Sequence, residues 1–180
     1  MIDFLKGEKV ENSKKIIRPI LWAIFATYAF LVIYLCFFSR KPDETRTIVE
    51  YFNEKSNFVP FKTILNYIKL SFEGYVTLAW ANVFGNFILL LPLGMLIPCL
   101  IRRVDCFREI ILLSFLTIIG IEGLQCVFRV GVVDIDDLIL NLSGSVLGYG
   151  LVNVPIIYRA LYEIGAIEDG GGKNEKSRKE

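Results

Sequence analysis

The sequence predicts an all-α membrane protein with four transmembrane helices. Apolar residues make up 54% of its 180 residues, so little polar sequence is left for a separate soluble domain. The apolar residues also fall into long runs with few charges. Several runs reach the roughly 18 residues that a helix needs to cross the hydrocarbon core of a bilayer. The length and spacing of these runs therefore predict a single transmembrane domain.

Four spans follow from the runs. We expect them at residues 17–38, 79–101, 110–128 and 137–158. Pro19 falls in the first turn of the first span, where proline is tolerated. Pro92 and Pro98 are expected to bend the second span, and Pro155 to lie in the last turns of the fourth.

Polar segments flank and connect the spans. The expected organisation is an N-terminal segment at 1–16, a transmembrane domain at 17–158 and a charged, glycine-rich tail at 159–180. A tail of that composition is expected to be disordered. The long loop 39–78 is predicted to hold a helix over Thr45–Asn53. After it, apolar residues at helical spacing from 57 to 70 predict an amphipathic helix on the membrane surface.

Basic residues predict the orientation of the spans. Lysines are frequent before the first span, and Arg102, Arg103 and Arg108 lie between the second and third. The C-terminal segment is also rich in Lys and Arg, whereas the short loop 129–136 carries more acid than base. Because basic loops stay in the cytoplasm, we expect both ends inside and the long loop outside.

Composition excludes several functions. The chain has no histidine, which removes His-based acid/base catalysis and His metal ligands. Its net charge of +1 shows no excess of base for nucleic-acid binding. None of the four cysteines forms a C-x-x-C pair, so no metal site and no cofactor is predicted. Cys36 and Cys126 lie near the same membrane face, but we expect them to be small apolar helix residues rather than a disulfide.

Polar side chains inside the last three spans lie on one face of each helix. They are Asn82 and Asn86; Glu122, Gln125 and Arg129; and Asp137, Asn141 and Ser145. Their spacings of three, four, seven and eight residues bring each set to a single helix face. Ionisable and amide groups inside a span are costly, so they indicate a functional site.

These faces share one depth. At about 1.5 Å per residue, Glu122 lies roughly 10 Å from the outer boundary, and Asn86 at a similar depth. The expected arrangement is a polar pocket that opens outward. Its apolar floor is expected at Leu89–Leu91, Ile110–Leu113 and Leu147.

The loop after the third span is expected to lie over this pocket. Gly131 permits a tight reversal, and Asp136 or Asp137 can cap the fourth helix. The predicted ligand-binding residues are Asn82, Asn86, Glu122, Gln125, Arg129, Asp134, Asp136, Asp137 and Asn141. Small residues at Gly120, Gly123, Gly144 and Gly148 are expected to let helices approach closely.

Several segments also resemble a known family. Residues 82–94 read NVFGNFILLLPLG, 121–125 read IEGLQ, 134–144 read DIDDLILNLSG and 57–64 read NFVPFKTI. Together these motifs closely resemble the VanZ-like family, with a small departure at Leu142-Ser143, where Asn-Thr is common. The resemblance spans about residues 20–158. It implies a multi-pass protein of the bacterial cell membrane, in a family named for a protein associated with low-level resistance to teicoplanin, a lipoglycopeptide.

Three functions remain open. The pocket could bind an amphiphile, such as a lipoglycopeptide or a lipid-linked cell-wall precursor, with membrane lipids as its surroundings. Alternatively, Glu122 and Asp137 could serve as acid and base, or hold a divalent cation, in an enzyme acting on a lipid-linked substrate. No nucleophile or phosphate loop supports this second reading. Lastly, the polar residues could hold helices together in a structural or partner-binding subunit.

Overall fold

The computed structural model describes residues 2–101 and 106–167, and their secondary structure is helical apart from one isolated bridge. Four of the described helices are long and apolar enough to cross a membrane: Lys15–Phe38, Ala79–Leu100, Phe107–Val127 and Ile135–Val152. This confirms the predicted all-α class and the four spans. Of the tail that the sequence predicts to be disordered, residues 159–163 are helical, and residues from 168 onward lie outside the described ones.

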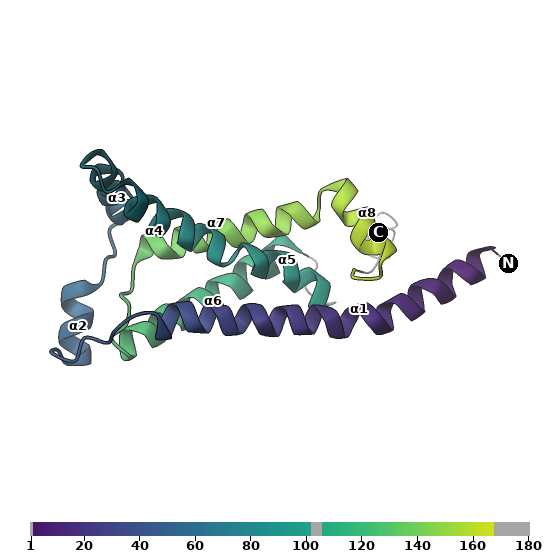
Figure 1. Cartoon of the computed structure of the whole chain (residues 1–180), viewed down its shortest axis with the longest axis horizontal. Coiled ribbons are helices and arrows are strands. Elements are labelled where there is room, and N and C mark those ends of the chain that lie inside the picture. Colours follow the sequence, from purple (N-terminus) through teal and green to yellow (C-terminus); the bar gives the residue numbers. More distant parts are fainter. Residues whose placement is uncertain (1, 102–105, 168–180) are drawn as a thin grey trace, which may run out of the picture.

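The first span is part of a longer helix. Helix α1 covers Ile2–Ile33, so the helix includes the polar residues before the span. It continues into a π-helical turn, η1, over Tyr34–Phe38. Figure 1 shows α1 running the length of the bundle, with its N-terminus at the same end as the C-terminal helix α8. The even number of spans accounts for this common end.

The second span is broken in the middle. Helix α4 covers Val76–Leu89 and α5 covers Leu91–Leu100. Pro92 lacks the N–H that a continuous helix would need, and its ring crowds the preceding turn, so the break falls at Leu90. The hydroxyl of Tyr28 in α1 donates to the carbonyl of Leu89 at 2.8 Å, which ties the break to the first helix.

Helix α7 lies at the centre of the bundle. It covers Ile135–Val152 and packs against α4, α5 and α6, the last of which covers Phe107–Val127. The sequence places Pro155 in the last turns of this span, which is wrong. Pro155 instead begins a separate helix, α8, over Pro155–Glu163. Proline is suited to the first position of a helix because its missing N–H would have no partner there.

Two shorter helices occupy the long loop. Helix α2 covers Ile48–Lys55 and α3 covers Lys62–Phe72, in agreement with both predicted loop helices. Thr47 and Glu50 form a reciprocal capping box that begins α2, and these hydrogen bonds from Thr47 lower the pKa of Glu50. Both helices lie at the end of the bundle opposite the N-terminus (Figure 1).

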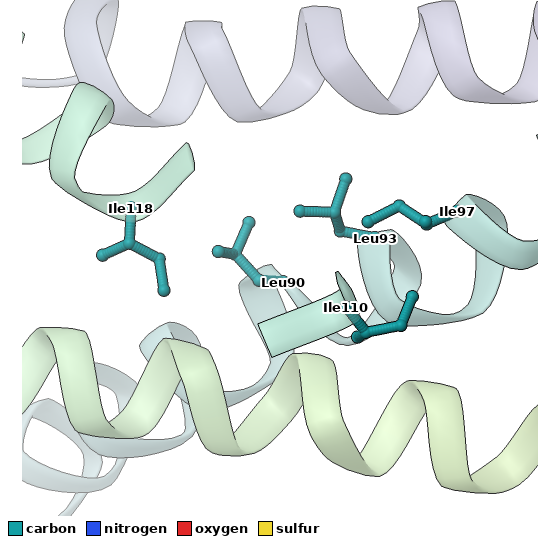
Figure 2. Packing of buried hydrophobic residues seen from close by; sticks show 5 residues of the cluster. All are labelled: Leu90, Leu93, Ile97, Ile110 and Ile118. Carbon is teal, nitrogen blue, oxygen red and sulfur yellow. The ribbon is translucent and has the colours of Figure 1, made fainter. Parts of the chain in front are cut away.

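The apolar core lies in the half of the bundle away from these loop helices. Figure 2 shows its five buried members: Leu90, Leu93, Ile97, Ile110 and Ile118. Leu90 lies at the break between α4 and α5, and the other four come from α5 and α6, where α7 packs over them. One polar pair is also buried here: the hydroxyls of Ser114 and Ser145 are 2.6 Å apart. Each hydroxyl satisfies the other, so the pair joins α6 to α7.

Candidate functional site

A pocket of about 260 Å³ opens between four elements of the bundle. Its lining comes from η1 and the two residues directly after it, from α4, from α6 and from α7. Leu89, Leu90 and Ile118 belong to its apolar lining, together with Leu35, Ala81 and Ile121. The floor predicted from sequence is therefore only partly right. Leu147 is 44% exposed and Ile110 belongs to the core further along the bundle, so neither lines the pocket.

Six of the nine predicted site residues line this pocket. They are Asn82, Asn86, Glu122, Gln125, Asp137 and Asn141. Their helices are far apart in sequence but meet here because α7 packs against both α4 and α6. The predicted convergence of three polar helix faces is thus present in the fold, while the role of each residue in ligand binding stays a prediction.

Glu122 is the more buried of the two acidic residues that line the pocket. Its side chain is only 5% exposed, and its Oε2 accepts the backbone N–H of Asp134 at 3.3 Å. Its other oxygen, Oε1, is buried and has no hydrogen-bond partner among the described residues. A buried acceptor without a donor is costly, so this oxygen is suited to receive a donor from a bound molecule.

Asn141 repeats this pattern on α7. The side chain is 7% exposed, and its Nδ2 donates to the carbonyl of Asp137 at 2.9 Å. Its Oδ1 is buried and finds no donor within the described structure. The pocket therefore holds two unsatisfied acceptor oxygens, one on α6 and one on α7.

Two further amides of the lining, Asn86 and Gln125, hold the pocket walls together. Asn86 on α4 donates to Oδ1 of Asp137 on α7. Gln125 on α6 donates through Nε2 to the carbonyl of Cys36 at 3.0 Å. Cys36 belongs to η1, so this bond fastens the π-helical turn to the third span. These bonds orient three helices around the two unsatisfied oxygens.

Asp136 faces away from the pocket and is completely buried against the long loop. Its carboxylate accepts backbone N–H groups of Phe61 at 2.5 Å, Thr63 at 2.7 Å and Ile64 at 3.1 Å. These are donors at the start of α3 that the helix itself leaves without partners. Asp136, which belongs to α7, therefore caps the N-terminus of α3.

Asp134 supports the same junction. The sequence assigns the cap of α7 to Asp136 or Asp137, but the N-cap is Asp134, whose side chain accepts the N–H of Asp136 at 2.9 Å. Its carboxylate also accepts from Thr63 Oγ1 at 2.6 Å and from Asn57 Nδ2 at 3.1 Å. Asn57 and Asp134 form the isolated bridge between the two loops. These bonds give the two family motifs at residues 134–137 and 57–63 a structural role.

Arg129 also lies outside the pocket. It makes the reversal after α6 that the sequence assigns to Gly131: its φ is 55°, and the N–H of Val130 donates to the carbonyl of Gln125 at 2.9 Å. Together with the bond from Arg129 N to Cys126 O, this is a Schellman-type helix end. Its guanidinium reaches Arg46, where Nη1 donates to the carbonyl at 2.6 Å.

The arginine that lines the pocket is Arg40 and not, as the sequence predicts, Arg129. It is exposed and lines the pocket directly after η1. Sequence reasoning passed over it because it lies beyond the first span. Its position just past the outer end of the first span, close to the predicted depth of the pocket, is the signal that could have included it.

Two other expectations concern metals and cysteines. Within the described chain, no group of three or more His, Cys, Asp or Glu side chains converges as metal ligands would. All four cysteines are free thiols, with Cys36, Cys99 and Cys126 buried.

The fold and the site together define a multi-pass helical membrane protein with a polar pocket between its spans. The family model described as VanZ/LLP1 matches residues 25–158, which is more than half of the chain. The chain belongs to the VanZ/LLP1 family, as its motifs indicated. No curated protein and no solved structure matches the chain.

Proposed function

We propose that this VanZ-like protein of the bacterial cell membrane binds an amphiphile in the pocket between η1, α4, α6 and α7, and thereby contributes to glycopeptide resistance. The ligand would be a lipoglycopeptide such as teicoplanin or a lipid-linked cell-wall precursor. The observation that carries the proposal is the pair of buried, unsatisfied oxygens, Glu122 Oε1 and Asn141 Oδ1, in the wall of the pocket. A role as internal glue alone does not account for two unsatisfied acceptors that face the same pocket.

The pocket is large enough for one part of an amphiphile but not for the whole molecule. Its volume of about 260 Å³ lies below the roughly 300–1,000 Å³ that encloses a drug-sized ligand. A head group or a tail segment fits such a space, and the rest of the molecule would lie among the helices and lipid. The exposed apolar side chains of Phe84 and Ile88 on α4 offer a surface for that part.

The test is protection against teicoplanin in a bacterium that lacks its own copy. We expect Glu122→Gln, Asn86→Ala and Asp137→Asn each to lower the protective effect at unchanged membrane abundance. The matched control is Ser143→Ala, because Ser143 is exposed and its hydroxyl donates within its own helix to Ile139. Full protection and full ligand binding by all three pocket variants would refute the proposal.

An enzyme is the second candidate, because Glu122 and Asp137 line the same pocket. One carboxyl would donate a proton to a lipid-linked substrate while the other accepts one. Incubating the purified protein with labelled wall lipids, with and without Mg²⁺, tests this. A product that disappears in Glu122→Gln would favour catalysis over binding.

A further inference from the structure

We infer that the head group entering the pocket carries a primary ammonium, as phosphatidylethanolamine does, and that this ammonium contacts Glu122 and Asn141. The inference rests on the proposed binding function and specifies its ligand class. Three independent features lead to it: the balance of charge in the lining, the kind of polar atom left unsatisfied, and the position of Arg40.

The charge balance favours a cation. The charged residues of the described lining are Glu122, Asp137 and Arg40. With both carboxyls ionised, two negative charges face one positive charge, and that positive charge lies at the exposed edge. A carboxylate at this depth in a membrane is costly unless it is paired. A ligand cation supplies the missing partner.

The unsatisfied atoms favour a cation with N–H groups. Neither Glu122 Oε1 nor Asn141 Oδ1 has a hydrogen-bond partner in the described structure; the amide oxygen is an acceptor, and so is the carboxyl oxygen when Glu122 is ionised. A phosphate or carboxylate offers only acceptors and would leave them unpaired. A primary ammonium has three donors, enough for both oxygens and one more. The quaternary ammonium of phosphatidylcholine has the charge but no N–H, so the pocket should discriminate between the two.

Arg40 favours an anion next to the ammonium. It lines the same pocket but is exposed, so it lies at the mouth while Glu122 lies inside. A guanidinium is well suited to a phosphate. An ammonium linked to a phosphate by a short chain would place its two charges against Glu122 and Arg40, with acyl chains continuing outward beside α4.

The experiment measures binding of three lipids to the purified full chain in detergent. Phosphatidylethanolamine, phosphatidylcholine and phosphatidylglycerol are used, each with the fluorophore on an acyl chain so that the head group is intact. Glu122→Gln removes the charge but keeps an acceptor for Asp134 N. Gly85→Leu fills the pocket, since Gly85 lines it and a Cβ there meets nothing within 4 Å. Gly120→Leu is the control, because it also adds a side chain in open space but outside the lining.

We expect phosphatidylethanolamine to bind about 10- to 100-fold more tightly than the other two, the range for a hydrogen bond to a charged group. Glu122→Gln should remove that preference, Gly85→Leu should abolish binding, and Gly120→Leu should retain it. Equal binding of all three lipids, or preference for phosphatidylcholine or phosphatidylglycerol, would overturn the ammonium inference while leaving pocket binding intact if Gly85→Leu still abolishes it. Lipid binding that is unchanged by Gly85→Leu would overturn the proposed function as well.

Discussion

Adjacent acidic residues in this protein have opposite surroundings. Asp136 is enclosed by backbone N–H groups at the start of α3, whereas Asp137, the next residue, lines the pocket and accepts from Asn86. Successive residues of a helix point about 100° apart, so neighbours in sequence can serve different faces. One acid thus organises the loop and the other is available to a ligand.

This difference predicts opposite results for two similar substitutions. Asp136→Asn should destabilise the fold by about 2–4 kcal/mol, because an amide nitrogen would replace one acceptor of charge-assisted hydrogen bonds in a buried site. Asp137→Asn should leave stability nearly unchanged, since the amide oxygen still accepts from Asn86. Thermal unfolding of both variants in detergent measures the difference. Equal stability of the two would contradict the assignment of Asp136 to the loop junction.

Exposed acids in the long loop have a different, local role. The Thr45 side chain and backbone N–H, followed by Arg46, lower the pKa of Asp43 through hydrogen bonds. Arg46 also pairs with Glu54 at 2.7 Å. Surface pairs of this kind contribute little to stability. They lie where the loop meets Arg129, whose carbonyl accepts from Asp43 N at 2.9 Å.

At the scale of elements, close helix approach determines where α7 lies. A Cβ at Gly144 would lie 1.8 Å from the carbonyl oxygen of Phe87, and one at Gly148 would lie 2.1 Å from that of Leu91. Both contacts involve backbone, which cannot move aside as a side chain can. The predicted close approach is confirmed for these two glycines. It is wrong for Gly120 and Gly123, where a Cβ would meet nothing within 4 Å.

The backbone contact predicts a sharp difference between two glycines of α7. Gly148→Ala should cost at least about 1–3 kcal/mol through overpacking, because the new methyl group would force α7 away from α5. Gly150→Ala has open space and should be neutral or stabilising by up to about 1 kcal/mol, since alanine favours helix. Comparing the unfolding temperatures of the two variants tests this. Equal tolerance would mean that α7 does not contact α5 through backbone.

For the whole molecule, orientation follows from charge rather than from contacts. The N-terminus and α8 lie at one end of the bundle, and α2 and α3 at the other (Figure 1). The excess of Lys and Arg in the N- and C-terminal segments predicts that the first end faces the cytoplasm. The pocket residue Arg40, which follows η1 at the other end, would then face the outer leaflet.

Cys106 gives a direct test of orientation. It is exposed and belongs to the end of the bundle that carries the N-terminus, whereas the other three cysteines are buried. A membrane-impermeant maleimide should therefore label the protein only after cells are permeabilised. As a control, Glu44→Cys in a Cys106→Ser background should be labelled in intact cells. Labelling of Cys106 from outside would reverse the predicted orientation.

Much of this architecture was predictable because its causes are local. Long apolar runs determine spans, proline determines where they break or end, and a three-to-four-residue period determines the polar face of each helix. The family motifs also lie in continuous segments. The all-α class, the spans, the family and the convergence of six polar residues, Glu122 among them, all follow from such information.

Only the tertiary structure decided how the polar residues divide between pocket and scaffold. Asp134, Asp136 and Arg129 are close in sequence to pocket residues, but their partners in the long loop are more than seventy residues away in sequence. Arg40 enters the pocket through the packing of η1, which the sequence alone does not specify. Periodicity specifies which face of a helix is polar, whereas the contacts between helices decide what that face meets.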